Sequence, residues 1–121
     1  EGKYTSFLSK NRTLPMMYME DALRATIELT EAPSKNVKIR SSYNLAGISF
    51  DPASISASIK KIVPEFELNF KPDYREEIAA SWPESIDDSA AQLDWGWAPK
   101  YDLEAMTKAM LTNLRAKLQL S

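Results

Sequence analysis

Apolar positions along the chain recur with a helical spacing in some stretches and alternate with polar ones in others. Met19, Leu23 and Ile27 fall four residues apart, which places them on one side of a helix, and a proline ends the pattern. We therefore expect a helix over about residues 19–32. A short strand at 14–18 is expected to lead into it.

Two stretches alternate apolar and polar residues, as half-buried strands do. The stretch VKIRSSYNLAG at 37–47 has Val37, Ile39, Tyr43 and Leu45 on one side. The stretch FELNF at 66–70 has Phe66, Leu68 and Phe70 on one face. We expect a strand at each of these places, with Gly47 marking a turn after the first.

Start and stop signals predict two further helices in the middle of the chain. Asp51 followed by Pro52 favours a helix start, because the aspartate can accept backbone N–H groups and proline suits the first turn. The expected buried stripe of that helix consists of Ile55, Ile59 and Ile62. The segment 72–83 begins and ends with proline, so it holds at most two helical turns.

A short helix is predicted in DDSAAQLDWG, where Ser89 and Gln92 have the spacing of a capping box. The negative charges of Asp87 and Asp88 would interact favourably with the positive N-terminal end of the helix dipole. Gly96 is placed to end this helix in the left-handed conformation, so that Trp97 packs back onto the last turn. We expect Trp95 and Trp97 to belong to the core for this reason.

The final helix is predicted to begin after Asp102, which would cap it. Its expected apolar face consists of Leu103, Met106, Met110, Leu114 and Leu118. The order of strands and helices favours an α/β class, but too few strands are present for a doubly wound sheet. Because the helices have more apolar face than these strands can cover, we expect residues 1–121 to be part of a longer polypeptide. The missing initiator methionine agrees with that expectation.

Composition excludes several classes of function. The chain has 121 residues and a net charge of −2, with both signs mixed along it, so we expect no nucleic-acid partner. No apolar run approaches the roughly 20 residues of a membrane helix, so no membrane segment and a cytoplasmic location are expected. The chain has neither cysteine nor histidine, which removes disulfides, thiolate nucleophiles, imidazole bases and the usual zinc ligands. We expect no metal site.

Few residues indicate catalytic chemistry. The three glycines are scattered, so no glycine-rich phosphate loop is formed, and none of the five tyrosines has a lysine four residues later. The adjacent acids at 76–77 and 87–88 would point in different directions, which favours solvated side chains over a catalytic pair. Arg75 could hold a substrate carboxylate, although a surface arginine is the commoner outcome.

Trp82 lies in the irregular segment SWP, outside any apolar periodicity. Its ring could face a ligand pocket or could be buried for packing, and the sequence pattern leaves both interpretations open.

The segments MMYMEDALRATIELTEAP, SSYNLAGISFDP and SWPESIDDSAAQLDWGWAPKYDL together resemble the C-terminal portion of the extended short-chain dehydrogenase family. Within that family they are most similar to the NAD-dependent L-threonine 3-dehydrogenases. The resemblance covers nearly the whole chain. It implies that residues 1–121 form the substrate-binding lobe, while an N-terminal Rossmann domain of the same polypeptide holds NAD.

By the same resemblance, Trp82 would form a wall of the substrate pocket, in a region where sugar-nucleotide enzymes usually place an arginine. The family's catalytic serine, tyrosine and lysine lie upstream of position 1, so no catalytic, cofactor-binding or metal-binding residue is assigned here. The chain alone would be inactive, and the complete protein would be a homodimer that oxidises L-threonine to 2-amino-3-oxobutanoate. Two alternatives stay open: the lobe of a sugar-nucleotide epimerase or dehydratase, and a free-standing interaction module.

Overall fold

The computed structural model describes residues 2–119. Its strands are β1 (Lys3–Ser6), β2 (Leu14–Met16), β3 (Ile48–Phe50) and β4 (Glu67–Phe70). Its helices are α1 (Met19–Glu31), α2 (Pro52–Lys60), α3 (Tyr74–Ala80), α4 (Ser89–Trp95) and α5 (Leu103–Leu118). The predicted mixture of helices and strands is confirmed. Among the described residues, no helix has the length and apolar character needed to cross a membrane.

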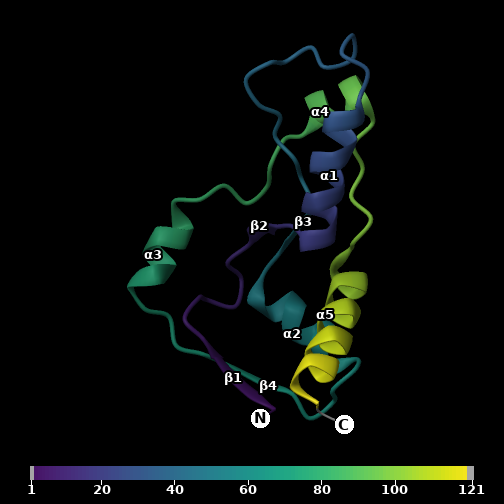
Figure 1. Ribbon diagram of the computed structural model, residues 1–121. Helices are drawn as coiled ribbons and strands as arrows, with labels where there is room; N and C mark the ends of the chain where they lie inside the picture. Colours follow the sequence, from purple (N-terminus) through teal and green to yellow (C-terminus); the bar gives the residue numbers. More distant parts are fainter. Residues whose placement is uncertain (1, 120–121) are drawn as a thin grey trace.

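The strands form two separate pairs. β1 and β4 are parallel, with Lys3 opposite Glu67, whereas β2 and β3 are antiparallel, with Leu14 opposite Phe50. Figure 1 shows α1 and α4 near one end of the molecule and α2 and α5 near the other, while α3 stands to one side. The prediction of too few strands for a doubly wound sheet is confirmed for the described residues.

The expected strand at 37–47 is wrong, because these residues have no neighbouring strand to pair with. Side chains satisfy part of this backbone instead. The N–H of Ala46 donates to Asp88 Oδ2 at 3.2 Å, and Trp97 Nε1 donates to the Ala46 carbonyl at 3.0 Å. The strand of this region is β3, which begins only after the alternating pattern has ended.

Gly47 does not mark a turn but lies where two backbone segments approach closely. A Cβ atom at this position would lie 2.6 Å from the Met16 carbonyl oxygen and 3.0 Å from Met17 Cα. Those distances are shorter than van der Waals contact, and the atoms concerned belong to the backbone. Glycine is therefore needed at 47 for β3 to pair with β2.

The predicted starts of α2 and α5 are confirmed. Asp51 accepts the N–H of Ser54 at 2.7 Å, and Asp102 accepts the N–H of Ala105 at 2.8 Å. Each carboxylate thus satisfies a backbone donor that has no partner within the helix.

The capping box expected at the start of α4 is wrong. Asp88, and not Ser89, is the N-cap residue of α4, and its carboxylate binds outside the helix backbone. Gln92 Nε2 donates to Asp88 Oδ1 at 2.6 Å, while Asp88 Oδ2 accepts the N–H of Ala46. Asp88 therefore joins α4 to the 37–47 segment.

The predicted end of α4 is confirmed. Gly96 has φ of 75°, in the left-handed region, and the N–H of Trp97 donates to the Ala91 carbonyl at 3.3 Å. The Trp97 side chain is only 2% exposed and packs with Ala25 and Ala91 in the main core. The core prediction for Trp97 is confirmed, and Trp95 is partly buried against the same cluster.

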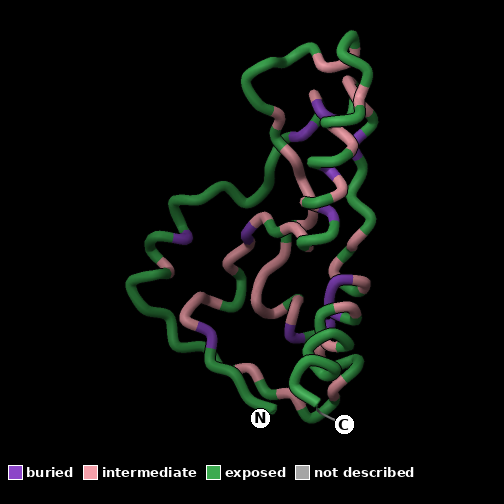
Figure 2. Tube along the Cα trace, in the orientation of Figure 1, coloured by how far each residue is buried: buried purple, intermediate pink, exposed green. Residues whose placement is uncertain are grey.

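Several predicted apolar faces are not covered. Met19, Leu23 and Ile27, the stripe of α1, are 68%, 59% and 57% exposed. The same holds for the second half of the α5 face, which consists of Met110, Leu114 and Leu118. Figure 2 shows how few stretches of the chain are buried.

The stripe expected on α2 is also not the buried side of that helix. Ile55 and Ile59 are only partly buried, and Ile62 lies beyond the helix and is exposed. Ser56 and Ser58 are buried instead, because Ser58 Oγ donates to Thr107 Oγ1 of α5 at 2.9 Å. The hydroxyls of Ser58 and Thr107 therefore lie at the contact between α2 and α5, whereas Ile55 and Ile59 stay partly exposed.

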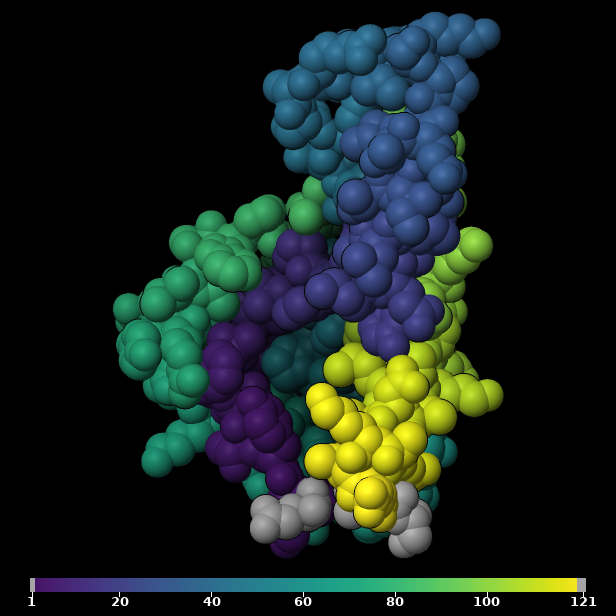
Figure 3. Space-filling model, viewed as in Figure 1, coloured from purple at the N-terminus to yellow at the C-terminus, as the bar shows by residue number. Residues whose placement is uncertain are grey.

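The total accessible surface gives the scale of this exposure. The chain exposes 8476 Å². A compact monomer of 13.7 kDa would expose roughly 6,600 Å² by the usual dependence of surface on mass, so the excess is about 1,900 Å². Figure 3 shows that the outline is hollowed between the N-terminal segment (purple) and α5 (yellow).

Candidate functional site

An apolar pocket of about 270 Å³ lies beside Trp82. The loop after β1, the strand β2 and the helix α3 supply its walls. The lining residues are Phe7, Leu8, Leu14, Met16, Arg75, Ile78, Ala79 and Trp82. Trp82 itself is 58% exposed, so its ring is not sealed in a core. Trp82 therefore lines a cavity, and its role toward a substrate stays a prediction.

The end of α3 positions Trp82. The helix ends at Ala80, and Ser81 Oγ donates to the Ile78 carbonyl at 2.7 Å. The N–H of Trp82 donates to the Ala79 carbonyl at 3.1 Å. Pro83 has no N–H, so it cannot donate the next backbone hydrogen bond of the helix. Trp82 therefore lies just beyond the last turn of α3.

Arg75 lines the same pocket, but its guanidinium already has a carboxylate partner. Arg75 Nη2 donates to Asp73 Oδ2 at 2.6 Å, and Nε donates to Oδ1 at 3.1 Å. The guanidinium also stacks on the Phe7 ring, 3.6 Å from its centroid. The substrate-carboxylate role considered for Arg75 would therefore need it to exchange Asp73 for the ligand.

A polar recess adjoins the apolar pocket on the other side of this stack. It measures about 290 Å³ and is lined by Thr5, Ser6, Phe7, Lys71, Pro72, Asp73 and Arg75. It lies at the carboxyl ends of the parallel strands β1 and β4, where ligands commonly bind in α/β proteins. Phe7 and Arg75 border both cavities, so an apolar and a polar surface meet at one place.

Glu76 connects α3 to the loop between β1 and β2. Its carboxylate accepts the N–H of Ser9 at 2.9 Å, Ser9 Oγ at 2.8 Å and Arg12 Nε at 2.9 Å. Arg12 Nη2 lies 2.7 Å from the same carboxylate. The hydrogen bond from the Ser9 backbone, followed by that from Arg12, lowers the pKa of Glu76 below its ordinary value. The carboxylate is therefore ionised throughout the neutral range.

The adjacent acids do not form catalytic pairs. Glu76 binds Ser9 and Arg12, while the side chain of Glu77 is exposed. Asp87 accepts the N–H of Ser89 at 3.0 Å, and Asp88 accepts hydrogen bonds from Gln92 Nε2 and from the N–H of Ala46. Among residues 2–119, no group of three or more acidic side chains is arranged to hold a metal ion.

Asp21 is the most deeply buried carboxylate of the described residues, at 1% exposed. It accepts the backbone N–H groups of Lys100 and Tyr101 and forms an ion pair with Arg24 at 2.9 Å. Burial raises the pKa of Asp21, but the hydrogen bonds from Arg24, Tyr101 and Lys100 outweigh burial and lower the pKa overall. Asp21 thus holds the start of α1 against the segment that leads into α5.

Tyr101 is not suited to act as a base. Its hydroxyl donates to the Glu20 carboxylate, and this hydrogen bond is the main reason why the pKa of Tyr101 is raised to about 12. The ring also packs against Tyr18, with centroids 4.4 Å apart. At neutral pH Tyr101 therefore stays a protonated phenol.

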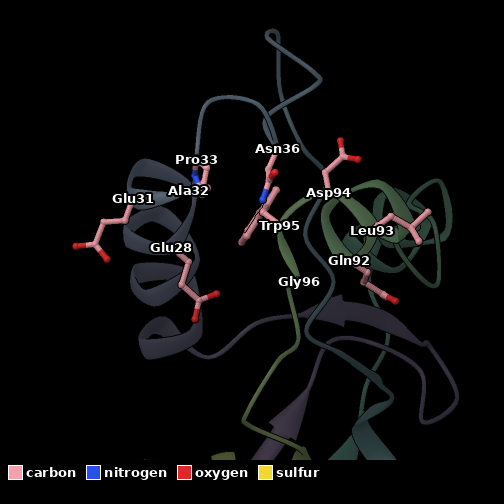
Figure 4. Close-up of a pocket in the computed structure, with 10 residues that line it drawn as sticks. All are labelled: Glu28, Glu31, Ala32, Pro33, Asn36, Gln92, Leu93, Asp94, Trp95 and Gly96. Atoms are coloured by element: carbon pink, nitrogen blue, oxygen red, sulfur yellow. The ribbon is translucent and has the colours of Figure 1, made fainter.

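Figure 4 shows a wider recess of about 580 Å³ between the end of α1 and α4. Two of its acidic side chains already have partners within the chain, whereas the buried Trp95 Nε1 has none among the described residues. Asp94 accepts the Tyr43 hydroxyl at 2.7 Å and pairs with Lys38, and Glu28 pairs with Arg24 at 2.7 Å. Trp95 borders this recess and packs edge-on against Tyr43, so it joins the loop to the core.

Sequence reasoning assigned Trp82 to a candidate site but missed Asp21 and Glu76. Glu76 was interpreted as a solvated acid, and no role was assigned to Asp21. Their partners lie 79 and 67 residues away, in segments that no local pattern connects. Only the fold reveals these two roles.

No model of a known protein family matches the chain. An uncharacterised epimerase/dehydratase of Staphylococcus aureus strain N315 is 46% identical over 118 residues. The match covers 97% of this chain and 37% of the relative. An uncharacterised epimerase/dehydratase of strain MW2 gives the same values.

Solved structures of L-threonine dehydrogenases are similar in both sequence and fold. The GalE-like L-threonine dehydrogenase of Cupriavidus necator is 55% identical with a TM-score of 0.88, and the match covers 93% of this chain and 40% of that enzyme. The L-threonine dehydrogenase of Phytophthora infestans is 49% identical with a TM-score of 0.91, covering 96% and 38%. That of Clostridium difficile is 40% identical with a TM-score of 0.91, covering 96% and 37%.

The chain thus spans about two fifths of the length of the relatives it matches. The matched portion includes 93–96% of this chain in these structures. The fold and the coverage of these matches fit a C-terminal portion of an extended short-chain dehydrogenase, similar to that of L-threonine 3-dehydrogenases and epimerase/dehydratases.

Proposed function

We propose that residues 1–121 form the substrate-binding lobe of a longer NAD-dependent enzyme that oxidises L-threonine to 2-amino-3-oxobutanoate. The observation that carries this proposal is the apolar pocket at Trp82, in a chain whose fold matches L-threonine dehydrogenases. Its volume of about 270 Å³ is below the roughly 300–1,000 Å³ of pockets for drug-sized ligands, which suits a small substrate.

The two adjoining cavities fit the two ends of an amino acid. The apolar pocket would take the aliphatic part of threonine, with Trp82 as one wall. The polar recess would take the charged end, where Lys71 can meet a carboxylate and Arg75 can do so after exchanging Asp73 for it. A substrate without phosphate needs no further positive charge near Trp82.

The described residues do not fit the cofactor. Gly47 packs against the Met16 carbonyl and Gly96 ends α4, so neither is free to approach a pyrophosphate. We therefore assign NAD to another part of the polypeptide. Oxidation of the threonine hydroxyl releases a hydride and a proton, and NAD, when bound, accepts the hydride. This chain would contribute substrate binding and orientation only.

The uncovered faces of α1 and α5 support the same assignment. A stable assembly of two polypeptide parts commonly buries 2,000 Å² or more in total, and the chain exposes about 1,900 Å² more than a compact monomer would. The remaining part of the polypeptide, which in the relatives is the larger share, would cover these faces. The homodimer and the cytoplasmic location stay predictions from the family resemblance.

A sugar-nucleotide epimerase or dehydratase is the second candidate, because two relatives are named as uncharacterised epimerase/dehydratases and the family resemblance includes enzymes that act on sugar nucleotides. The free-standing module is less well supported, because such a module would need to cover its own apolar faces. These exposed faces belong to α1 and α5.

The test is a substrate comparison with the complete polypeptide that contains this chain. We expect NADH to form with L-threonine and not with UDP-hexoses. Turnover of a UDP-hexose without threonine oxidation would favour the second candidate. Absence of both activities, with NAD bound, would contradict the assignment to either enzyme.

A further inference from the structure

Glu76 joins the two elements that form opposite walls of the Trp82 pocket. The loop after β1 supplies Phe7 and Leu8, and α3 supplies Ile78 and Ala79. Figure 3 shows α3 (green) resting against this N-terminal segment (purple). A carboxylate on one wall therefore accepts several donors from the other.

Few other contacts hold α3 in place. Figure 1 shows it apart from the other helices, joined to β4 by residues 71–73 and to α4 by residues 81–88. Besides the Glu76 contacts, the Arg75 guanidinium stacks on Phe7, the N–H of the N-cap residue Asp73 donates to the Phe7 carbonyl at 3.2 Å, and Ala79 is buried at the pocket. The Glu76 carboxylate is the group that binds both a backbone N–H and a guanidinium of the loop.

The geometry of these contacts is specific. Ser9 donates through its backbone and its hydroxyl, to different oxygens of the Glu76 carboxylate. Arg12 donates through Nε and approaches through Nη2, which fixes the plane of the guanidinium. The Glu76 side chain is 18% exposed and that of Arg12 is 28% exposed, so water shields these contacts only in part. Hydrogen bonds to charged groups of this kind are stronger than neutral ones.

We propose that Glu76 is a positioning residue that sets the width of the Trp82 pocket by holding the loop at 7–13 against α3. This inference rests on the proposed function, because the pocket is taken as the substrate site. Glu76 contacts no substrate in this account. It acts through the distance between the Trp82 indole and the loop residues that face it.

The chain offers a matched control for this proposal. Glu77 has the same charge, lies on the same helix and is exposed. Glu76→Ala removes the contacts to the loop, whereas Glu77→Ala removes a solvated carboxylate. Glu76→Gln keeps the size of the side chain and one oxygen but loses the charge, so it should give an intermediate result.

The experiment measures steady-state kinetics of the complete polypeptide with L-threonine. For Glu76→Ala we expect KM for threonine to rise about tenfold while kcat changes by less than about twofold. The lost pocket contacts would stabilise the bound substrate and the transition state equally, and losing such contacts raises KM without changing kcat. Glu77→Ala should leave both constants unchanged. Combined with Trp82→Ala, the Glu76 substitution should have little further effect, because the two act on one pocket.

Three results would overturn the proposal: an unchanged KM for Glu76→Ala, an equal effect of Glu77→Ala, or full additivity with Trp82→Ala. Failure of the proposed function is separated by a second measurement. Acrylamide quenching of the Trp82 emission, taken as the difference from Trp82→Phe, should increase in Glu76→Ala even in a protein that oxidises no threonine. Unchanged quenching would overturn the positioning role by itself.

Discussion

Asp21 and Lys100 lie 79 residues apart in the sequence, yet both oxygens of the Asp21 carboxylate accept the Lys100 N–H, each at 3.1 Å. The contact holds the start of α1 beside the segment that leads into α5. The uncovered stripes of these two helices are therefore fixed relative to each other. A partner can be complementary in shape to a surface whose geometry is fixed. A surface whose two helices moved relative to each other would present no single shape to match.

Replacing Asp21 by Asn should strongly destabilise the fold. The amide would offer a donor where Lys100 and Tyr101 also donate, and the Arg24 guanidinium would lose one of its two charged partners. We expect the free energy of unfolding to fall by about 3 kcal/mol, the scale of breaking a buried ion pair by removing one partner. Urea unfolding measures the change. Glu31→Gln, at an exposed position of α1, is the control and should change little.

The same carboxylate predicts how stability depends on acid. Because the pKa of Asp21 is lower in the folded than in the unfolded chain, its contribution is complete at neutral pH. It should be lost only as the pH falls below about 4 and passes through the lowered pKa. Thermal unfolding at a series of pH values should show a loss of stability in this range. In Asp21→Asn that loss should be smaller than in the wild type.

Gly47→Ala should destabilise the β2–β3 pair. The new methyl group would lie 2.6 Å from the Met16 carbonyl oxygen, so the strands would have to separate. We expect a cost of about 1–3 kcal/mol, typical of overpacking. Gly2→Ala is a matched control, because there the nearest atom would be 3.7 Å away. An equal loss of stability in both variants would contradict the close-approach explanation of Gly47.

Trp82→Ala in the complete polypeptide should weaken threonine oxidation without unfolding the protein. Loss of an aromatic pocket wall should reduce kcat/KM by about 1–3 kcal/mol of transition-state binding, and Trp82→Phe should restore part of it. Leu93→Ala removes an exposed apolar side chain outside the lining of the Trp82 pocket and should have no effect. An unchanged kcat/KM for Trp82→Ala would remove Trp82 from the substrate site.

Local sequence signals predicted the helices well. Asp51, Asp102 and Gly96 act on backbone groups within a few residues of themselves, so their roles can be inferred from spacing alone. The core position of Trp97 followed from Gly96 by the same local logic.

Predictions that needed a distant partner were less successful. The alternating pattern at 37–47 did not become a strand, because alternation indicates a half-buried extended segment but not a neighbour to pair with. Ser58 was missed as a buried residue because its partner, Thr107, is 49 residues away. The pocket at Trp82 has the same origin, since its walls come from three separate parts of the chain.

The central claim is that the apolar faces of α1 and α5 are shaped to be covered by the rest of a longer polypeptide. Sedimentation velocity of the isolated chain over a range of concentrations, with binding of a hydrophobic dye, tests it most directly. The account predicts association that increases with concentration and dye binding that the complete polypeptide lacks. A monodisperse monomer that binds no dye and unfolds in one sharp transition would contradict it.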